Sequence, residues 1–121
     1  MSASRVLVIE DDLAIRTLIV ELLRDEGYEV RGAADGLAGL DQMEWPPDLI
    51  VLDLMMPVMD GATFLAHRRQ IPERCGIPVI IVTARRDAQP EIDAMGVSAI
   101  IGKPFDDDDL LATVASLLNG A

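Results

Sequence analysis

The chain has little cysteine, little positive charge and no long apolar run. Cys75 is its single cysteine, which excludes an internal disulfide and fits a reducing compartment. Ten Lys and Arg residues stand against 21 Asp and Glu residues, so the net charge is −11, and nucleic acid and anionic membrane surfaces should repel the chain. No apolar stretch approaches the roughly 18 residues that span a bilayer. We therefore expect a cytoplasmic protein with no direct contact to nucleic acid or membrane.

Apolar residues, in contrast, are plentiful enough for one well-packed core. They make up 50% of the 121 residues, and no linker, internal repeat or low-complexity segment interrupts them. Residues 1–121 are therefore expected to form a single domain. The opening segment MSASRVLVIEDD has only a short apolar run that ends in three acids, so a signal peptide is not expected.

Short apolar runs alternate with segments of helical periodicity five times along the chain. The runs predict strands at 5–10, 28–33, 49–53, 78–83 and 99–102. The periodic segments predict helices at 13–26, 36–44, 61–70, a short one between Pro90 and Gly96, and a last one opened by Asp106 to Asp109. Trp45, beside Pro46-Pro47, is expected to pack at the end of the second helix. This alternation predicts an α/β, doubly wound (βα)5 fold with a five-stranded parallel sheet in the order 2-1-3-4-5 and helices on both faces.

Polar residues stand at the ends of four of the five predicted strands. They are Glu10, Asp11 and Asp12 after the first strand, Asp53 at the third, Thr83 at the fourth and Lys103 at the fifth. The carboxyl ends of parallel strands share one edge of a sheet, so these groups are expected to converge. Carboxylates at such short range repel one another, and a hard divalent cation such as Mg²⁺ relieves the repulsion.

This combination of groups suits the chemistry of a phosphoryl group. A metal ion, Lys103 and Thr83 can neutralise and hydrogen-bond phosphoryl oxygens, and Asp53 in their midst can be the nucleophile that forms an aspartyl phosphate. Taken singly, the residues have simpler explanations. Asp12 can cap the first helix, and Lys103 can extend its ammonium group into solvent. The combination at four strand ends favours the phosphoryl site.

Four motifs, VLVIEDD, LIVLDLMMPVMDG, IIVTA and KPF, occur in this order and spacing. Together they resemble the response-regulator receiver domain of two-component signalling, a chemotaxis-receiver-like domain of flavodoxin-like fold, over essentially all of the chain. The resemblance implies a phosphoacceptor switch that is no enzyme beyond its own self-dephosphorylation. It implies that Asp53 accepts a phosphoryl group from a sensor histidine kinase or phosphotransfer protein. We expect a monomer or weak dimer, either a stand-alone receiver or the excised N-terminal domain of a longer regulator, with its downstream partner or output domain unidentified.

The resemblance also implies the metal site and the phosphoryl contacts. Mg²⁺, with Mn²⁺ as a substitute, would be held by Asp11, Asp53 and the backbone carbonyl of Met55, and Glu10 would act through a metal-bound water. The phosphoryl contacts and their surroundings would be Thr83, Lys103, the small Ala84 and a cis peptide bond before Pro104. The loop after the third strand would be shaped by Pro57, Asp60 and Gly61.

The sequence departs from the family pattern in its switch region. Ile100 stands three residues before Lys103, where the family has an aromatic residue, and isoleucine is stiff at χ1 and has no hydroxyl group. The segment between Thr83 and Lys103 is also shorter than usual. Our hypothesis is that the chain signals through a rearranged fourth-helix region and not through the usual symmetric dimer. Met55 and Arg85 would tune hydrolysis, and Met55 predicts a long-lived phosphoryl state.

Two other functions also use acidic or phosphate-binding residues at strand ends, and the sequence lacks a residue or motif that each needs. A Mg²⁺-dependent phosphohydrolase with an aspartyl-phosphate intermediate needs a second acid two residues after the nucleophile, and Met55 stands there. A flavin-binding electron carrier needs a Ser/Thr/Gly-rich phosphate loop after the first strand, whereas this chain has EDDLA. The phosphoacceptor is therefore favoured over both.

Overall fold

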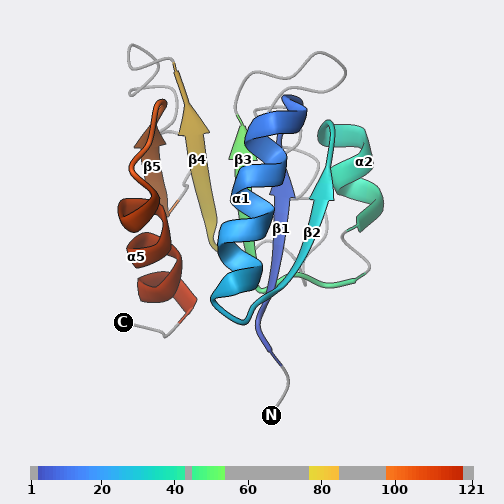
Figure 1. The fold of residues 1–121 in the computed structure, drawn as a ribbon. Coiled ribbons are helices and arrows are strands. Elements are labelled where there is room, and N and C mark those ends of the chain that lie inside the picture. Colours follow the sequence, from blue (N-terminus) through green and yellow to red (C-terminus); the bar gives the residue numbers. More distant parts are fainter. Residues whose placement is uncertain (1–2, 43–44, 54–76, 85–97, 119–121) are drawn as a thin grey trace.

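The structure is a computed structural model that describes residues 3–42, 45–53, 77–84 and 98–118 (Figure 1). Five strands form one parallel sheet in the order β2-β1-β3-β4-β5, which confirms the predicted doubly wound fold. The strands are β1 (Arg5–Ile9), β2 (Glu29–Ala33), β3 (Leu49–Asp53), β4 (Val79–Thr83) and β5 (Ala99–Gly102). The helices among the described residues are α1 (Leu13–Asp25), α2 (Gly36–Asp41) and α5 (Asp107–Leu118). The helices predicted at 61–70 and after Pro90 lie outside the described residues.

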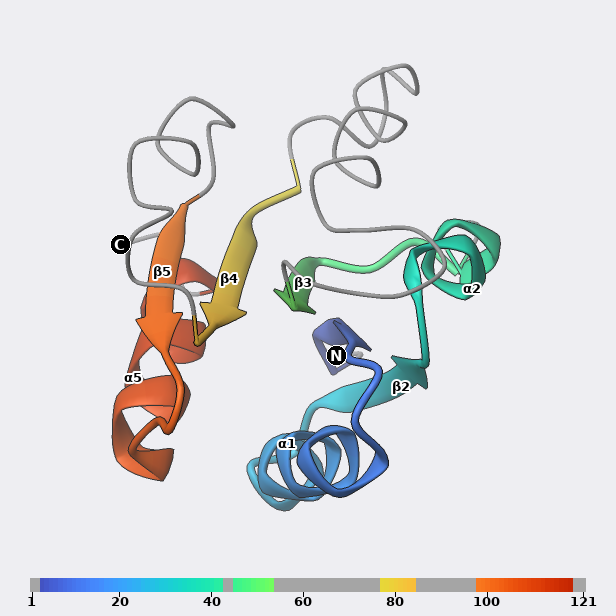
Figure 2. The same ribbon diagram turned by 90° about the horizontal axis from the view of Figure 1, so that it is seen from above.

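Helices cover both faces of the sheet. Figure 2 shows α1 and α5 together on one face and α2 on the other. Each face has its own apolar core, one around Leu7 and Ile50 and the other around Val8 and Val51, because successive side chains of a strand point to opposite faces. β3 and β4 are buried at all their positions, while the edge strand β2 has both buried and exposed residues. The apolar runs of β1, β3 and β4 therefore became the central strands, whereas the polar run of β2 and the short run of β5 became the two edges.

The start of α1 is fixed by Asp12. Its Oδ1 accepts a hydrogen bond from the backbone N–H of Ile15 at 3.0 Å, so the capping interpretation of this acid is correct. Ile19 and Leu23 are buried against the sheet, whereas Leu18, which shares their helical spacing, is 43% exposed. The chain then turns at Gly27, whose φ of 95° favours glycine.

The start of α5 is fixed by Asp106 in a similar way. The carboxylate of Asp106 accepts hydrogen bonds from the backbone N–H groups of Asp108 and Asp109 at 2.8 and 3.4 Å. The acids of the first turn also stabilise the positive end of the helix dipole. Leu110 and Val114 are buried beneath. Among the described residues, no helix is both long and apolar enough to span a bilayer.

Candidate phosphoryl and metal site

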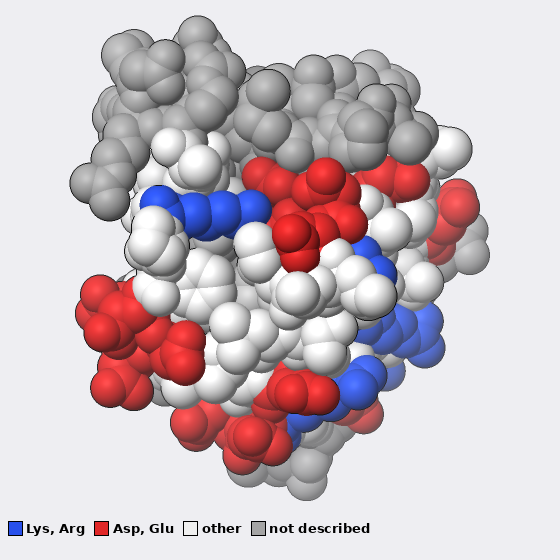
Figure 3. Space-filling view, turned by 45° about the horizontal axis from the view of Figure 1, so that its top comes forward, with Lys and Arg blue, Asp and Glu red and all other residues white. Residues whose placement is uncertain are grey.

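The polar residues predicted for the site lie at the carboxyl edge of the sheet. Glu10 directly follows β1, while Asp53 and Thr83 are the last residues of β3 and β4. All three are buried, with 2% of Glu10 and 6% of Asp53 exposed. Figure 3 shows acidic side chains gathered at this edge with a basic side chain beside them. Buried acids are rare without a partner, so this edge differs from an ordinary loop surface.

Lys103 follows β5 and is the cation of this edge. Its Nζ lies 2.6 Å from Glu10 Oε1 and 3.5 Å from Asp53 Oδ2, and its side chain is only 17% exposed. Burial alone would lower the pKa of Lys103, but the hydrogen bond to Glu10 and the charges of Asp53 and Glu10 outweigh it, so the pKa is raised. The ammonium group therefore faces the acids, and the alternative in which it extends into solvent does not hold.

Three acids share the edge with this single lysine. Carboxylate oxygens of Glu10, Asp11 and Asp53 lie within 4.8 Å of one another. The pKa of Glu10 is raised to about 7. Burial is the main cause, the acidic neighbours also raise the pKa, and the hydrogen bond to Lys103 lowers it. Asp11 is mostly exposed, and the small part of it that is buried raises its pKa slightly. Its hydrogen bonds to Glu10 and Asp53 outweigh this effect, so the pKa of Asp11 lies below its usual value. The edge thus gathers more negative charge than it neutralises.

The donors present fit a divalent cation. Glu10 Oε1 is buried, and its partner within the described part of the chain is the Lys103 ammonium at 2.6 Å. The carboxylates of Glu10, Asp11 and Asp53 form a set of hard oxygen donors, which Mg²⁺ prefers. A bound cation would also offset the repulsion among these acids. The fit rests on this donor chemistry.

Arg16, which the sequence analysis missed, supports the loop that carries the acids. Its Nη1 donates to the backbone carbonyl of Glu10 at 2.8 Å, and its aliphatic stem packs over Gly32 on β2. A Cβ at Gly32 would lie 3.2 Å from Arg16 Cδ, tighter than an ordinary contact. A glycine inside a strand is a sequence sign of such close approach, and it could have pointed to this neighbour.

The remaining predicted residues divide into two groups. Thr83 is buried, its carbonyl accepts a hydrogen bond from the Lys103 backbone N–H at 2.9 Å, and the Lys103–Pro104 bond is cis. Ala84 lines a cavity of about 390 Å³ next to Lys103, with Ile15, Leu18, Pro104 and Phe105. The predicted residues that lie outside the described part are Met55, Pro57, Asp60, Gly61 and Arg85.

Ile100 occupies the centre of β5. It pairs with Ile81 in the register of β4 and β5, and its partly buried side chain packs against the apolar core around Leu7 and Ile50. At this position the chain therefore presents a β-branched side chain that is part of the core.

The chain matches one known protein family over most of its length. A family model described as the response regulator receiver domain matches residues 6–115. The chain belongs to this family. Receiver domains are signalling proteins of two-component systems, and the sheet order described above is that of the solved receiver structures.

Individual relatives support the assignment. The chain is 39% identical over 117 residues to the DNA-binding dual master transcriptional regulator RpaA of Synechocystis, covering 94% of this chain and 48% of that regulator. It is 36% identical over 121 residues to sporulation initiation phosphotransferase F of Bacillus subtilis, covering 98% and 96%. The structure of the Vibrio cholerae chemotaxis protein CheY4 superimposes with a TM-score of 0.89 at 31% identity, covering 96% and 99%. The receiver thus spans about half the length of RpaA and nearly all of the latter two proteins.

Proposed function

We propose that this receiver accepts a phosphoryl group on Asp53, in a Mg²⁺-dependent reaction, from a sensor histidine kinase or a phosphotransfer protein. The observation that carries the proposal is the position of the Asp53 carboxylate. It is nearly buried at the end of β3, 3.5 Å from the Lys103 ammonium and grouped with Glu10 and Asp11. A nucleophile between a cation and a metal-ligand set is what phosphoryl transfer needs.

Each residue then has a defined part in the transfer. An Asp53 oxygen attacks the phosphorus of the donor, so an O–P bond forms as the bond from phosphorus to the donor breaks. Lys103 and the Thr83 hydroxyl hold the phosphoryl oxygens. Asp11, Asp53 and the Met55 carbonyl would bind Mg²⁺, with Glu10 linked through water, and bound Mg²⁺ supplies neutralisation of the phosphoryl charge.

The relatives and the composition support proposals on partners. One relative is by name a phosphotransferase and another a DNA-binding regulator of about twice the matched length. We infer that residues 1–121 are one domain that receives the phosphoryl group in the cytoplasm as a monomer or weak dimer. The net charge of −11 argues against direct nucleic-acid or membrane contact by this chain. Any output lies with a downstream partner or an attached domain.

We also propose an unusual response to phosphorylation. Ile100 is stiff and packed on the core, so this position offers no aromatic side chain that could change its conformation on phosphorylation. The response should then occur in the segment between Thr83 and Lys103. Self-dephosphorylation, the one expected turnover, should be slow because Met55 offers no strong hydrogen bond to an attacking water. Structures with and without a phosphoryl mimic test the first point, and the decay of the phosphorylated chain tests the second; decay within seconds would contradict it.

Intact-mass spectrometry after incubation with acetyl phosphate tests the main proposal. With Mg²⁺ the wild type should gain one phosphoryl adduct, and EDTA or Asp53→Asn should abolish it. Asp108→Asn is a matched control, because Asp108 is an exposed acid at the start of α5, and it should keep the adduct. An adduct that persists in Asp53→Asn would contradict the assignment of the acceptor.

A further inference from the structure

Three arginines line a pocket at the end of the sheet opposite the phosphoryl site. Arg5 begins β1, Arg24 lies in the last turn of α1, and Arg31 lies on the edge strand β2. With Tyr28 and Trp45 they line an open depression of about 540 Å³. The cations of the described residues are thus divided between two places, because the other two, Arg16 and Lys103, belong to the carboxyl edge.

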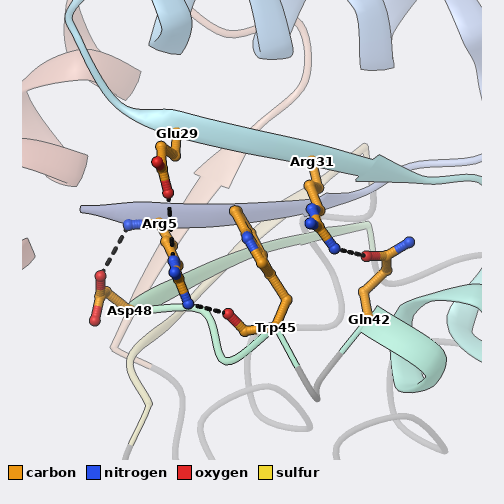
Figure 4. Close-up of polar contacts among 6 residues, drawn as sticks. All are labelled: Arg5, Glu29, Arg31, Gln42, Trp45 and Asp48. Atoms are coloured by element: carbon orange, nitrogen blue, oxygen red, sulfur yellow. Dashed lines mark hydrogen bonds and ion pairs between the residues drawn. The ribbon is translucent and has the colours of Figure 1, made fainter. Parts of the chain in front are cut away.

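Trp45 holds two of these arginines in position. Figure 4 shows its indole between the two guanidinium groups, with Arg31 Cζ 4.7 Å and Arg5 Cζ 5.6 Å from the ring centroid. The Arg5 guanidinium also donates to the Trp45 carbonyl and to Glu29 Oε2, and Arg31 Nη1 donates to Gln42 Oε1 at 3.1 Å. Stacking and hydrogen bonds reduce the freedom that a guanidinium would lose on binding a ligand.

Much of the positive charge in this pocket is unpaired. Within the described residues, neither Arg24 nor Arg31 forms an ion pair, although the chain has 21 acids for 10 bases. Arg24 Nη2 donates to the Val30 carbonyl at 3.0 Å, and Arg31 donates to an amide. A guanidinium has five N–H donors, so most donors of both groups remain for a ligand.

A purely structural role explains only part of the arrangement. Arg5 joins β1 to the segment before β3, since its backbone N–H donates to Asp48 Oδ2 at 2.8 Å and its carbonyl accepts from the Asp48 N–H. Arg24, however, belongs to α1, which packs on the face of the sheet opposite Trp45, and among the described residues its guanidinium donates to the Val30 carbonyl of the edge strand. Joining these segments therefore does not require the charge of Arg24.

We propose that this arginine pocket binds a short acidic segment of a partner protein, with Asp or Glu carboxylates on Arg24 and Arg31. Arg5, Arg24, Arg31 and Glu29 give the pocket a formal charge of +2, enough for a few carboxylates, whereas a long polyanion would also meet the acids that give the chain its net charge of −11. The pocket borders an edge strand, where an extended peptide finds backbone groups. Because it lies away from Asp53, the partner could remain bound during phosphoryl transfer; the proposal does not depend on that transfer.

Calorimetric titration of the whole chain, in buffer without Mg²⁺, tests the proposal. An oligo-glutamate peptide should bind and change the fluorescence of Trp45, the only tryptophan, while an oligo-glutamine peptide should do neither. Arg24→Gln and Arg31→Gln should each weaken binding about tenfold, as loss of a charged hydrogen-bond pair does. The arginines that stack on Trp45 are Arg5 and Arg31, so the Arg24 variant tests binding without removing a stacked guanidinium.

Two controls separate a site from general electrostatics. Arg31→Gln combined with Asp108→Asn restores the wild-type net charge, and its binding should stay weak; recovered binding would overturn the proposal. Inorganic pyrophosphate should compete poorly with the peptide. If pyrophosphate bound more tightly than the peptide, the ligand would be a small polyanion and the proposal of an acidic peptide would be wrong. Equal binding of oligo-glutamate by wild type and the two arginine variants would also overturn the proposal.

Discussion

The two ends of the sheet gather charge in opposite ways. At the carboxyl end, the acids Glu10 and Asp53 are buried, their oxygens lie close together, and a single lysine faces them. At the amino end, the arginines stay partly or fully exposed, and two of them, Arg5 and Arg31, lie on the two faces of the Trp45 indole. Exposed charge is nearly free of desolvation cost, whereas buried charge is not. The carboxyl end therefore carries a desolvation cost that the amino end does not.

The largest effect that tests this contrast is expected from the removal of Lys103. Lys103→Met leaves Glu10 and Asp53 buried without their cation, so the free energy of unfolding in EDTA at pH 8 should fall by about 3 kcal/mol. Urea unfolding measures the change. The loss should shrink at pH 5, where protonated Glu10 no longer needs a cation. An equal loss at both pH values would mean that Lys103 contributes packing and not charge.

Glu10 should make the protein without metal less stable as the pH rises. Its pKa is raised from 4.5 to about 7 in the folded state, so the folded state binds the proton more tightly than the unfolded state. The stability that this proton contributes is present below about pH 4.5 and is lost as the pH rises through 7. Glu10→Gln keeps the polar group without the charge, so in EDTA it should exceed the wild type by roughly 2 kcal/mol at pH 8 and match it at pH 4.

The control for this prediction is Glu21→Gln, which changes an exposed glutamate on α1. Its stability difference from the wild type should be small and should not vary with pH. Saturating Mg²⁺ should reverse the order of wild type and Glu10→Gln at pH 8, because the cation then stabilises the charged form. A Glu10→Gln variant less stable than the wild type at every pH would contradict the assignment of Glu10 as a destabilising buried charge.

Much of the carboxyl end was predictable from the sequence, for a physical reason. Continuous apolar runs specify central parallel strands, and the carboxyl ends of such strands share one edge. The sequence alone therefore predicts that Asp53, Thr83 and Lys103 lie at one edge of the sheet. The role of Asp12 stayed open, because an acid after a strand can serve as a helix cap or as a ligand; its bond to Ile15 decides for the cap.

Contacts that depend on strand pairing were not predictable in this way. Trp45 was expected to pack at a helix end, and it does contact the core. Its position between Arg5 and Arg31 follows from the pairing of Arg5 with Glu29 and of Leu7 with Arg31, which places both arginines on one face of the sheet. The role of Arg16 also depends on how the chain folds, because its partners are the backbone carbonyl of Glu10 and Gly32 on β2.

Arg16 should position the acidic loop, and its loss should weaken Mg²⁺ binding. Arg16→Met keeps the stem over Gly32 but removes the bond to the Glu10 carbonyl, so we expect a loss of about tenfold in Mg²⁺ affinity by calorimetry. Arg16→Lys should recover part of it. A purely structural role would instead lower the thermal midpoint of both variants and leave the affinity unchanged.

The smallest effect should come from the amino end. Arg31→Gln removes one face of the stack on Trp45, an exposed cation–π contact of about 0.5–1 kcal/mol, and it should lower the free energy of unfolding by no more than that. Its rate of phosphorylation by acetyl phosphate should equal that of the wild type, because Arg31 lies on β2, away from the cluster at Asp53. Parallel urea unfolding and intact-mass time courses measure both quantities. A slower phosphorylation rate in this variant would show that the two ends of the sheet are coupled and that their separation, on which the comparison rests, is incomplete.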